Sequence, residues 1–256
     1  MTKPIRAVLF DAYGTLFDVH SVALRAEALF PGCGMRLSQV WRDKQIEYSR
    51  LVTTCNDGAH YQPFWALTQA ALSYAIDAIL LIAEKSMNTQ TTGQFDVRNA
   101  SANASTNDFK ASAMAQLMNE YRHLSAYPEN RSVLQGLKDR GIKTGILSNG
   151  DAQMLDIAVK SAGLGDVLDH VISVDAVRRY KTHPAAYALG PQTLGLKVGE
   201  IGFVSSNSWD ALAATWYGYR TLWVNRSGMP FDTLGTQPTH LGQSLADITQ
   251  FFGETA

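Results

Sequence analysis

The amino-acid sequence predicts an α/β fold, in which a doubly wound, Rossmann-like parallel sheet carries an inserted helical cap domain. Three observations lead to this prediction. Short runs rich in β-branched and aromatic residues alternate with helical patterns, most of these runs end in polar residues, and a long helical stretch separates the first run from the second. Strands that alternate with helices form parallel sheets with helices on their faces.

Five short apolar runs are the predicted strands. They are AVLFDAY at 7–13, KTGILSN at 143–149, HVISVD at 170–175, GFVSSN at 202–207 and RTLWVNR at 220–226. Ligands bind beyond the carboxyl ends of the strands in such sheets. The polar residues that stand there are Asp11, Ser148, Asn149, Asp175 and Ser205 to Asn207. We therefore expect these side chains to converge on one site.

A long segment of helical spacing, residues 17–127, lies between the first two predicted strands. Apolar residues at 37, 40, 41, 46, 48, 51 and 52 predict one helix, and residues 61–83 predict another. We expect residues 17–127 to form the cap domain. Residues 1–16 and 128–256 then form the α/β core domain.

Composition and charge limit the partners. The chain has 256 residues, 46% of them hydrophobic and 18% charged, which is enough to bury a sizeable core. A formal net charge of −1 gives no reason to expect nucleic acid or an anionic membrane. The apolar stretch at 70–83 is short for a membrane span and contains Asp77, so we expect a buried helix. The N-terminus lacks a signal-peptide pattern, which predicts a cytoplasmic protein.

Four residues that follow the predicted strands indicate chemistry. An isolated acid such as Asp11 is usually a turn residue. Here Thr15 follows four residues later, Lys181 follows the third predicted strand, and Asp210 begins a helix after the fourth. An acid, a hydroxyl, a lysine and a second acid in this order on a doubly wound sheet predict a catalytic site.

These motifs resemble the haloacid dehalogenase superfamily. The segments FDAYGTLFDVHSV, VWRDKQIEYS, LSAYP, ILSNG, DHVISVDAVRRYK and FVSSNSWD resemble its L-2-haloacid dehalogenase branch. The resemblance covers most of the chain except residues 86–112, which are rich in Asn, Ser, Thr and Ala. This composition is typical of a mobile loop or a weakly formed helix. The resemblance implies the family's sheet, its helical cap and a homodimer formed through the cap helices.

Two positions indicate that the chain uses no metal and no other cofactor. Phosphatases of the superfamily carry a second aspartate two residues after the nucleophile and an acid four residues before the position of Asp210. Here these positions are Tyr13 and Ser206. Mg²⁺ prefers carboxylate-rich sites, and phosphoryl transfer depends on such a metal to stabilise the developing charge. The pocket suits displacement at a saturated carbon instead.

The resemblance implies a reaction with a small halogenated carboxylic acid. Asp11 would attack C2 of a short L-2-haloacid and form an ester, and water would then attack the carboxyl carbon of that ester. The products would be halide and a D-2-hydroxyacid. Lys181 would keep Asp11 ionised, and Thr15 would orient it. Ser148 and Asn149, before a helix that starts near Asp151, would hold the substrate carboxylate.

The remaining site residues follow from the same resemblance. Asp210, with Ser205 and Asn207, would position Lys181 and the hydrolytic water, and Tyr187 would join this network. Arg42 would receive the departing halide, because a guanidinium is always charged. The substrate pocket would be lined by Ala12, Tyr13, Ile46 and Trp209.

Three departures from the family's pattern keep other functions open. Asp43 stands where the family usually has glutamine, the cap segment 48–65 differs, and residues 86–112 have no counterpart. Fluoroacetate is one alternative substrate. Azetidine-2-carboxylate is another, because an acid beside the leaving-group site would suit a departing cationic nitrogen. A phosphatase and a catalytically silent binding module are further alternatives.

Overall fold

The computed structural model describes residues 4–88 and 106–248. Its centre is a six-stranded sheet in the order β3-β2-β1-β4-β5-β6, and all neighbouring strands are parallel. The strands are β1 (Ala7–Phe10), β2 (Lys143–Ser148), β3 (His170–Ser173), β4 (Ile201–Ser205), β5 (Arg220–Val224) and β6 (His240–Gly242). The predicted parallel α/β sheet is therefore confirmed, and β1 lies in its interior.

The edge strand β6 is absent from the sequence-based prediction. It is only three residues long, and Leu241 in its middle is exposed. A strand this short gives neither a continuous apolar run nor an alternating pattern. In contrast, β1 and β4 are buried along their whole length, as strands covered on both faces are.

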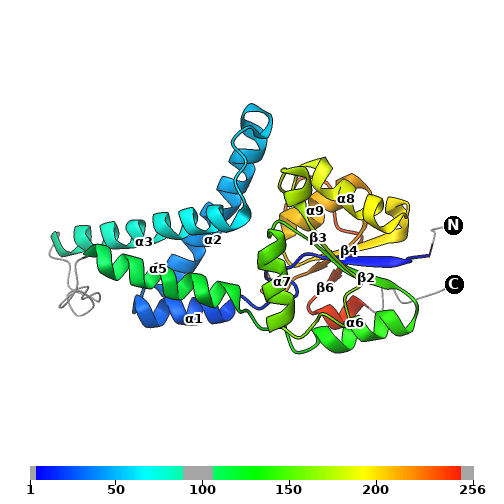
Figure 1. Ribbon diagram of the computed structural model, residues 1–256, viewed down its shortest axis with the longest axis horizontal. Coiled ribbons are helices and arrows are strands. Elements are labelled where there is room, and N and C mark those ends of the chain that lie inside the picture. Colours follow the sequence, from blue (N-terminus) through cyan, green and yellow to red (C-terminus); the bar gives the residue numbers. More distant parts are fainter. Residues whose placement is uncertain (1–3, 89–105, 249–256) are drawn as a thin grey trace.

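Within the part of the chain that the structure describes, four helices belong to the sheet domain. They are α6 (Asn130–Asp139), α7 (Ala152–Ser161), α8 (Pro184–Leu194) and α9 (Ser208–Tyr217). Figure 1 shows α8 and α9 on one face of the sheet and α6 on the other. Short 3-10 helices complete the connections: η2 (Val174–Val177), η3 (Val198–Glu200) and η4 (Leu245–Asp247).

Four further helices of the described residues lie between β1 and α6 and form a separate lobe beside the sheet (Figure 1). They are α1 (His20–Leu29), α2 (Gly34–Thr54), α3 (Phe64–Asn88) and α5 (Thr106–Arg122), with the 3-10 helix η1 (Cys55–Gly58) after α2. We call this lobe the helical insertion. Of the polar segment 86–112, residues 86–88 end α3 and residues 106–112 begin α5, so this part is helical. Residues 89–105 lie outside the described residues.

The two connections between the lobes run side by side. The Asp18 N–H donates to the Ser125 carbonyl at 2.8 Å, and the Tyr127 N–H donates to the Leu16 carbonyl at 3.3 Å. These contacts lie close to the predicted domain boundaries after residues 16 and 127. The division of the chain at those two points stays a prediction.

The helix α3 is unusually apolar. Its segment Phe64–Ile82 is long and apolar enough to cross a membrane by length and composition, and 39% of the most apolar window is buried in the structure. A core helix passes the same test, and α3 packs against α2 and α5 as a core helix does. The expected absence of a membrane partner stays a prediction.

Candidate active site

The site is built at the carboxyl ends of the central strands. The register pairs Phe10 with Ile146 on one side and with Val204 on the other, so the residues that follow these strands arrive at one level. The Asp11 N–H extends this pairing by donating to the Val204 carbonyl at 2.8 Å. Beyond Asp11 the chain turns through Gly14, whose φ of +85° favours glycine. The strand end therefore presents the Asp11 carboxylate at the sheet edge.

A buried lysine joins two carboxylates. The Lys181 Nζ lies 3.0 Å from Asp11 Oδ1 and 2.9 Å from Asp210 Oδ2, and the lysine side chain is 1% exposed. Burial acts to lower the pKa of Lys181, but the charges of Asp11 and Asp210 outweigh it, and the pKa lies above its ordinary value. Lys181 is therefore a fixed positive charge beside Asp11.

Both oxygens of Asp11 are held. Oδ1 contacts Lys181, while Oδ2 accepts hydrogen bonds from Asn207 Nδ2 at 2.8 Å and from Thr15 Oγ1 at 3.3 Å. Thr15 Oγ1 in turn accepts from the Ser206 N–H at 2.9 Å. A carboxylate fixed from several sides keeps one orientation, as a nucleophile requires.

The predicted support for Lys181 is also present. The Tyr187 hydroxyl donates to Asp210 Oδ1 at 2.7 Å, and Asp210 is fully buried at the start of α9. Burial and the charge of Asp210 raise the pKa of Tyr187 well above 10, so its phenol keeps the proton that it donates. Ser205 Oγ accepts from the Asn207 N–H at 3.1 Å, which fixes the turn that carries Asn207.

The turn after β2 leads directly into α7. Asp151 caps this helix, because its side chain accepts from the Met154 N–H at 3.0 Å, as expected for a helix that starts near Asp151. Asn149 Oδ1 accepts from the Lys181 N–H at 2.9 Å. The amide nitrogen of Asn149 and the hydroxyl of Ser148 are then the groups that the turn offers to a ligand.

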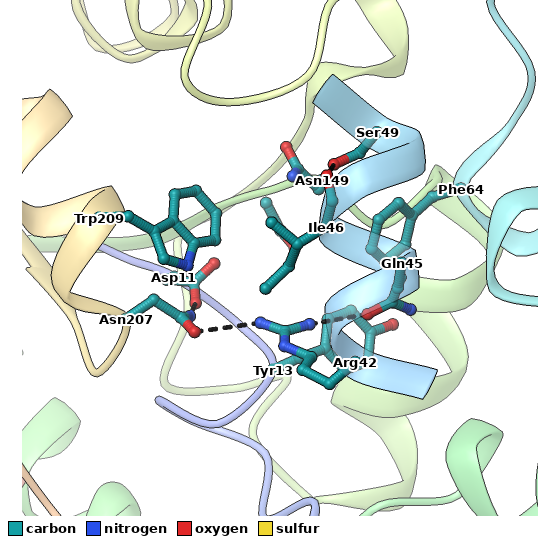
Figure 2. Close-up of a pocket in the computed structure, with 11 residues that line it drawn as sticks. Asp11, Tyr13, Arg42, Gln45, Ile46, Ser49, Phe64, Asn149, Asn207 and Trp209 are labelled. Atoms are coloured by element: carbon teal, nitrogen blue, oxygen red, sulfur yellow. Dashed lines mark hydrogen bonds between the residues drawn. The ribbon is translucent and has the colours of Figure 1, made fainter. Parts of the chain in front are cut away.

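A cavity of about 320 Å³, counted with the open space at its mouth, lies over Asp11 (Figure 2). It is lined by Asp11, Tyr13, Arg42, Gln45, Ile46, Ser49, Phe64, Ser148, Asn149, Asn207 and Trp209. Eight of these are predicted site residues. The other predicted residues stand behind the lining: Thr15, Lys181, Tyr187, Ser205 and Asp210 support it, and the buried Ala12 lies outside it.

One expectation about the strand ends is wrong. Asp175 does not join the other polar residues, because η2 begins at Val174 and turns it away from the cavity. Its carboxylate instead accepts a hydrogen bond from the Tyr61 hydroxyl of the helical insertion. Asp175 therefore links the two lobes rather than lining the site.

Arg42 spans the boundary between the insertion and the sheet domain. Its guanidinium donates to Gln45 Oε1 at 2.7 Å and to Asn207 Oδ1 at 3.1 Å, as the dashed lines in Figure 2 show. The Asn207 amide thus contacts Arg42 through its oxygen and Asp11 through its nitrogen. Asp43, the next residue, is exposed and accepts from Gln39 Nε2 at 2.8 Å, so it faces away from the cavity.

Three residues that line the cavity are absent from the sequence-based prediction: Gln45, Ser49 and Phe64. The buried face of α2 follows a step of four residues, namely Leu37, Trp41, Gln45, Ser49 and Thr53. The predicted apolar stripe shares only its first two members, because the second half of the face is polar. There Gln45 Nε2 donates to Thr68 Oγ1 and to the Tyr121 hydroxyl within the insertion. Counting in fours from Trp41 is the signal that identifies Gln45 and Ser49.

Tyr13 replaces the acid of the metal-dependent relatives. Burial raises the pKa of Tyr13 well above 10, and its ring stacks on Tyr121 with centroids 5.0 Å apart. Its side chain is therefore a neutral wall of the cavity. Among residues 4–88 and 106–248, no three His, Cys, Asp or Glu side chains gather as a metal site.

Comparisons with known sequences agree with this geometry. The family model of haloacid dehalogenase-like hydrolases matches residues 5–218. The (S)-2-haloacid dehalogenase of Pseudomonas sp. (strain YL) is 38% identical over 98% of this chain and 96% of its own length. Haloacetate dehalogenase H-2 of Moraxella sp. (strain B) is 39% identical over 92% of each chain.

Solved structures point the same way. The L-2-haloacid dehalogenase RSc1362 matches with a TM-score of 0.84 and 49% identity, over 98% of this chain and 100% of that chain. The L-2-haloacid dehalogenase of Xanthobacter autotrophicus with chloropropionic acid covalently bound matches with a TM-score of 0.78 and 34% identity, over the same shares. On the family match and these identities, the chain belongs to the haloacid dehalogenase-like hydrolases.

Proposed function

We propose that this protein hydrolyses the carbon–halogen bond of short L-2-haloalkanoates and releases halide and D-2-hydroxyacids. One observation carries the proposal: the Asp11 carboxylate, held by Lys181, Asn207 and Thr15, opens onto a small cavity that Arg42 also lines. Such a site holds a nucleophile and a fixed cation for a departing anion. The solved relative with covalently bound chloropropionic acid supports a covalent intermediate.

The first step is a displacement at carbon. A carboxylate oxygen of Asp11 attacks C2 of the substrate, the carbon–halogen bond breaks, and its electron pair leaves with the halide. The new bond is an ester between Asp11 and C2, and the configuration at C2 inverts. The Arg42 guanidinium stabilises the halide without transferring a proton.

The second step is ester hydrolysis. Water attacks the carboxyl carbon of the Asp11 ester, the bond from that carbon to the alcohol oxygen breaks, and the D-2-hydroxyacid leaves. One proton is released for each halide. Because the bond to C2 stays intact in this step, the overall reaction inverts C2 once.

The walls of the cavity favour short substrates. Ile46, Phe64 and Trp209 line it, and the Arg50 guanidinium lies 5.2 Å from the centre of the Trp209 ring. The alkyl group of the substrate would contact these apolar side chains, while Ser148 and Asn149 would bind its carboxylate. Chloroacetate, bromoacetate and 2-halopropionates fit this description best.

The structure gives less support to the alternative functions. Azetidine-2-carboxylate hydrolysis relied on an acid beside the leaving group, but Asp43 faces away from the cavity. Tyr13 and Ser206 stand where a phosphatase of this superfamily carries acids. Fluoroacetate uses the same nucleophile and cavity, so it belongs among the substrates to be tested.

The proposal is tested with L- and D-2-chloropropionate, with and without a chelator, by measuring chloride release and product chirality. We expect chelator-independent chloride release from the L-enantiomer alone, with D-lactate as product. Asp11→Asn should abolish it. Asp18→Asn is the matched control, because Asp18 lies in the same segment but bonds to the His20 N–H and not to the site. No release from either enantiomer by the folded protein would contradict the proposal, and azetidine-2-carboxylate and fluoroacetate would be tested next.

We also infer a homodimer that forms through the helical insertion. Several large apolar side chains are exposed there: Leu24, Met35, Leu51, Tyr74 and Leu81. An exposed apolar surface of this kind favours association. Sedimentation equilibrium should give twice the mass of the 256-residue chain. The cytoplasmic location and the expected absence of nucleic-acid and membrane partners stay predictions.

A further inference from the structure

The segment that carries Lys181 is held by the helical insertion. Residues 178–183 connect η2 to α8 without regular secondary structure. Tyr180 is fully buried, and its hydroxyl donates to the Gln62 carbonyl. The Arg179 guanidinium donates to the Asp57 carbonyl and to Asp57 Oδ1. Both partners belong to the stretch between α2 and α3, which is where the sequence departs from the family's pattern.

Two consecutive peptide N–H groups in this segment are fixed from opposite lobes. The Tyr180 N–H donates to Thr53 Oγ1 of α2 at 3.0 Å. The next N–H, that of Lys181, donates to Asn149 Oδ1 of the sheet domain at 2.9 Å. The peptide before Tyr180 is therefore bonded to a hydroxyl of the insertion, and the peptide after Tyr180 is bonded to an amide of the core.

The packing around these hydrogen bonds leaves little freedom. The Tyr180 ring lies 5.2 Å from the ring of Tyr61 and 5.7 Å from that of Phe64, measured between centroids. The φ of +70° at Gly58 favours glycine, and a Cβ atom there would lie 2.3 Å from Arg179 Nη1, so the Arg179 side chain packs directly against this turn. The insertion thus closes tightly on the segment before Lys181.

Thr53 is buried near the active site but does not contact the cavity. It ends the buried stripe of α2, is 5% exposed and does not line the cavity over Asp11. The stripe begins with apolar residues, so packing alone does not explain why a buried hydroxyl ends it. The acceptor that it offers to the Tyr180 N–H is the contact that the structure provides.

We propose that Thr53 is a positioning residue for Lys181. By holding the Arg179–Tyr180 peptide, its hydroxyl fixes the backbone one residue before the lysine and so sets the 3.0 Å contact between Lys181 Nζ and Asp11 Oδ1. Substituting it leaves the Tyr180 N–H buried without an acceptor and lets this peptide shift. A small misplacement of a charged group beside the nucleophile lowers the rate of the chemical step more than substrate binding. This inference rests on the proposed dehalogenation.

The test compares three variants by kcat and KM for L-2-chloropropionate. Thr53→Val keeps the shape but removes the acceptor, and we expect kcat to fall about 10-fold with KM within about twofold. Thr53→Ser restores the hydroxyl and should keep kcat within about twofold of wild type. Thr54→Val is the matched control: Thr54 is exposed and bonds only back to the Arg50 carbonyl of its own helix. Wild-type kcat in folded Thr53→Val, or an equal loss in Thr54→Val, would overturn the proposal.

A second measurement needs no variant. Amide hydrogen exchange of the wild-type protein should show the Tyr180 and Lys181 N–H groups protected as strongly as those of β1, although they lie in an irregular segment. Fast exchange at these two positions would overturn the proposal even if Thr53→Val does not fold. If the wild-type protein releases no halide, the dehalogenation fails, whereas the exchange result still tests the contact itself.

Discussion

The two halves of the active site are built differently. The sheet domain contributes residues from several strand ends, among them Asp11, Ser148 and Asn207, each placed by the pairing of its strand. The helical insertion contributes Arg42, Gln45, Ile46 and Ser49 from about two turns of α2, and Phe64 from the start of α3. Strand register is shared by the whole sheet, whereas a helix face can repack alone. We infer that the sheet half supplies the nucleophile and the groups that hold it, and that the insertion half supplies the contact to the departing halide.

The halves also differ in charge. Lys181 and Asp210 form a buried ion pair behind the sheet half, with side chains 1% and 0% exposed. On the insertion half, Arg42 is only partly buried and binds the amide side chains of Gln45 and Asn207. Substitutions in the sheet half should therefore lower both stability and rate. A substitution of the partly buried Arg42 should lower the rate and leave stability almost unchanged.

The largest effect is expected for Lys181→Met. This substitution leaves Asp11 and Asp210 buried without their cation, which should lower the free energy of unfolding by about 3–5 kcal/mol and abolish halide release. Urea unfolding gives the first quantity and chloride release the second. Adding Asp210→Asn removes one of the two buried charges, so the double variant should recover stability but no activity. An unchanged urea midpoint in Lys181→Met would contradict the proposed role of the ion pair.

The same substitution predicts a pH dependence. Because the pKa of Lys181 in the folded protein lies above its ordinary value of 10.5, its stabilising contribution is fully present below pH 10.5. The contribution is lost as the pH rises through the folded-state pKa. The difference in unfolding free energy between wild type and Lys181→Met should therefore stay constant from about pH 7 to 10 and shrink above that range. A difference that grows with pH would contradict the assignment.

Arg42→Lys tests the insertion half. A lysine keeps the charge but cannot contact Gln45 and Asn207 together, so the halide site loses its orientation. We expect kcat to fall by about 10²-fold, since removing one oriented donor from a charge-stabilising site has effects of this order. The free energy of unfolding should change by less than about 0.5 kcal/mol. Arg36→Lys, at an exposed position of the same helix, is the control and should behave as wild type.

The sequence predicts the site residues of the sheet half better than those of the insertion half. Asp11, Thr15, Ser148, Asn149, Lys181 and Asp210 are recognisable because polar residues at the ends of apolar strands stand out. In α2 the apolar pattern predicts a helix but misidentifies the second half of its buried face, because Gln45, Ser49 and Thr53 are polar. Gln45 bonds to Thr68 and Tyr121 within the insertion, and Thr53 accepts from the Tyr180 N–H of the sheet domain. Asp175 shows the converse, since η2 turns a polar residue at a strand end away from the site. Hydrogen bonds between residues far apart in the chain leave no periodic signal in either segment.

Tyr187→Phe should have a smaller effect, and it separates support from chemistry in the sheet half. The variant removes the 2.7 Å hydrogen bond to the buried carboxylate of Asp210. Hydrogen bonds to charged groups stabilise by about 1.5–3 kcal/mol, so the urea midpoint should fall while kcat decreases only severalfold. Tyr217→Phe in the neighbouring helix α9 is the control, because the hydroxyl of Tyr217 makes no contact with Asp210 among the described hydrogen bonds. An undiminished stability of Tyr187→Phe would show that water replaces the phenol beside Asp210.

Asp43→Asn should have the smallest effect of all, although it restores an amide where the family usually carries one. Asp43 stands next to Arg42 in sequence, but its side chain accepts from Gln39 on the exposed side of α2. Adjacent residues of a helix point in directions about 100° apart, so a charge at 43 does not face the halide that Arg42 binds. We expect kcat/KM for L-2-chloropropionate to stay within about twofold of wild type at low salt, where a distant charge would act most strongly. Glu47→Gln, which removes an exposed charge one turn further along α2, provides the comparison. A several-fold rise in activity for Asp43→Asn but not for Glu47→Gln would contradict this expectation. It would mean that α2 turns the side chain of residue 43 toward the halide site during turnover.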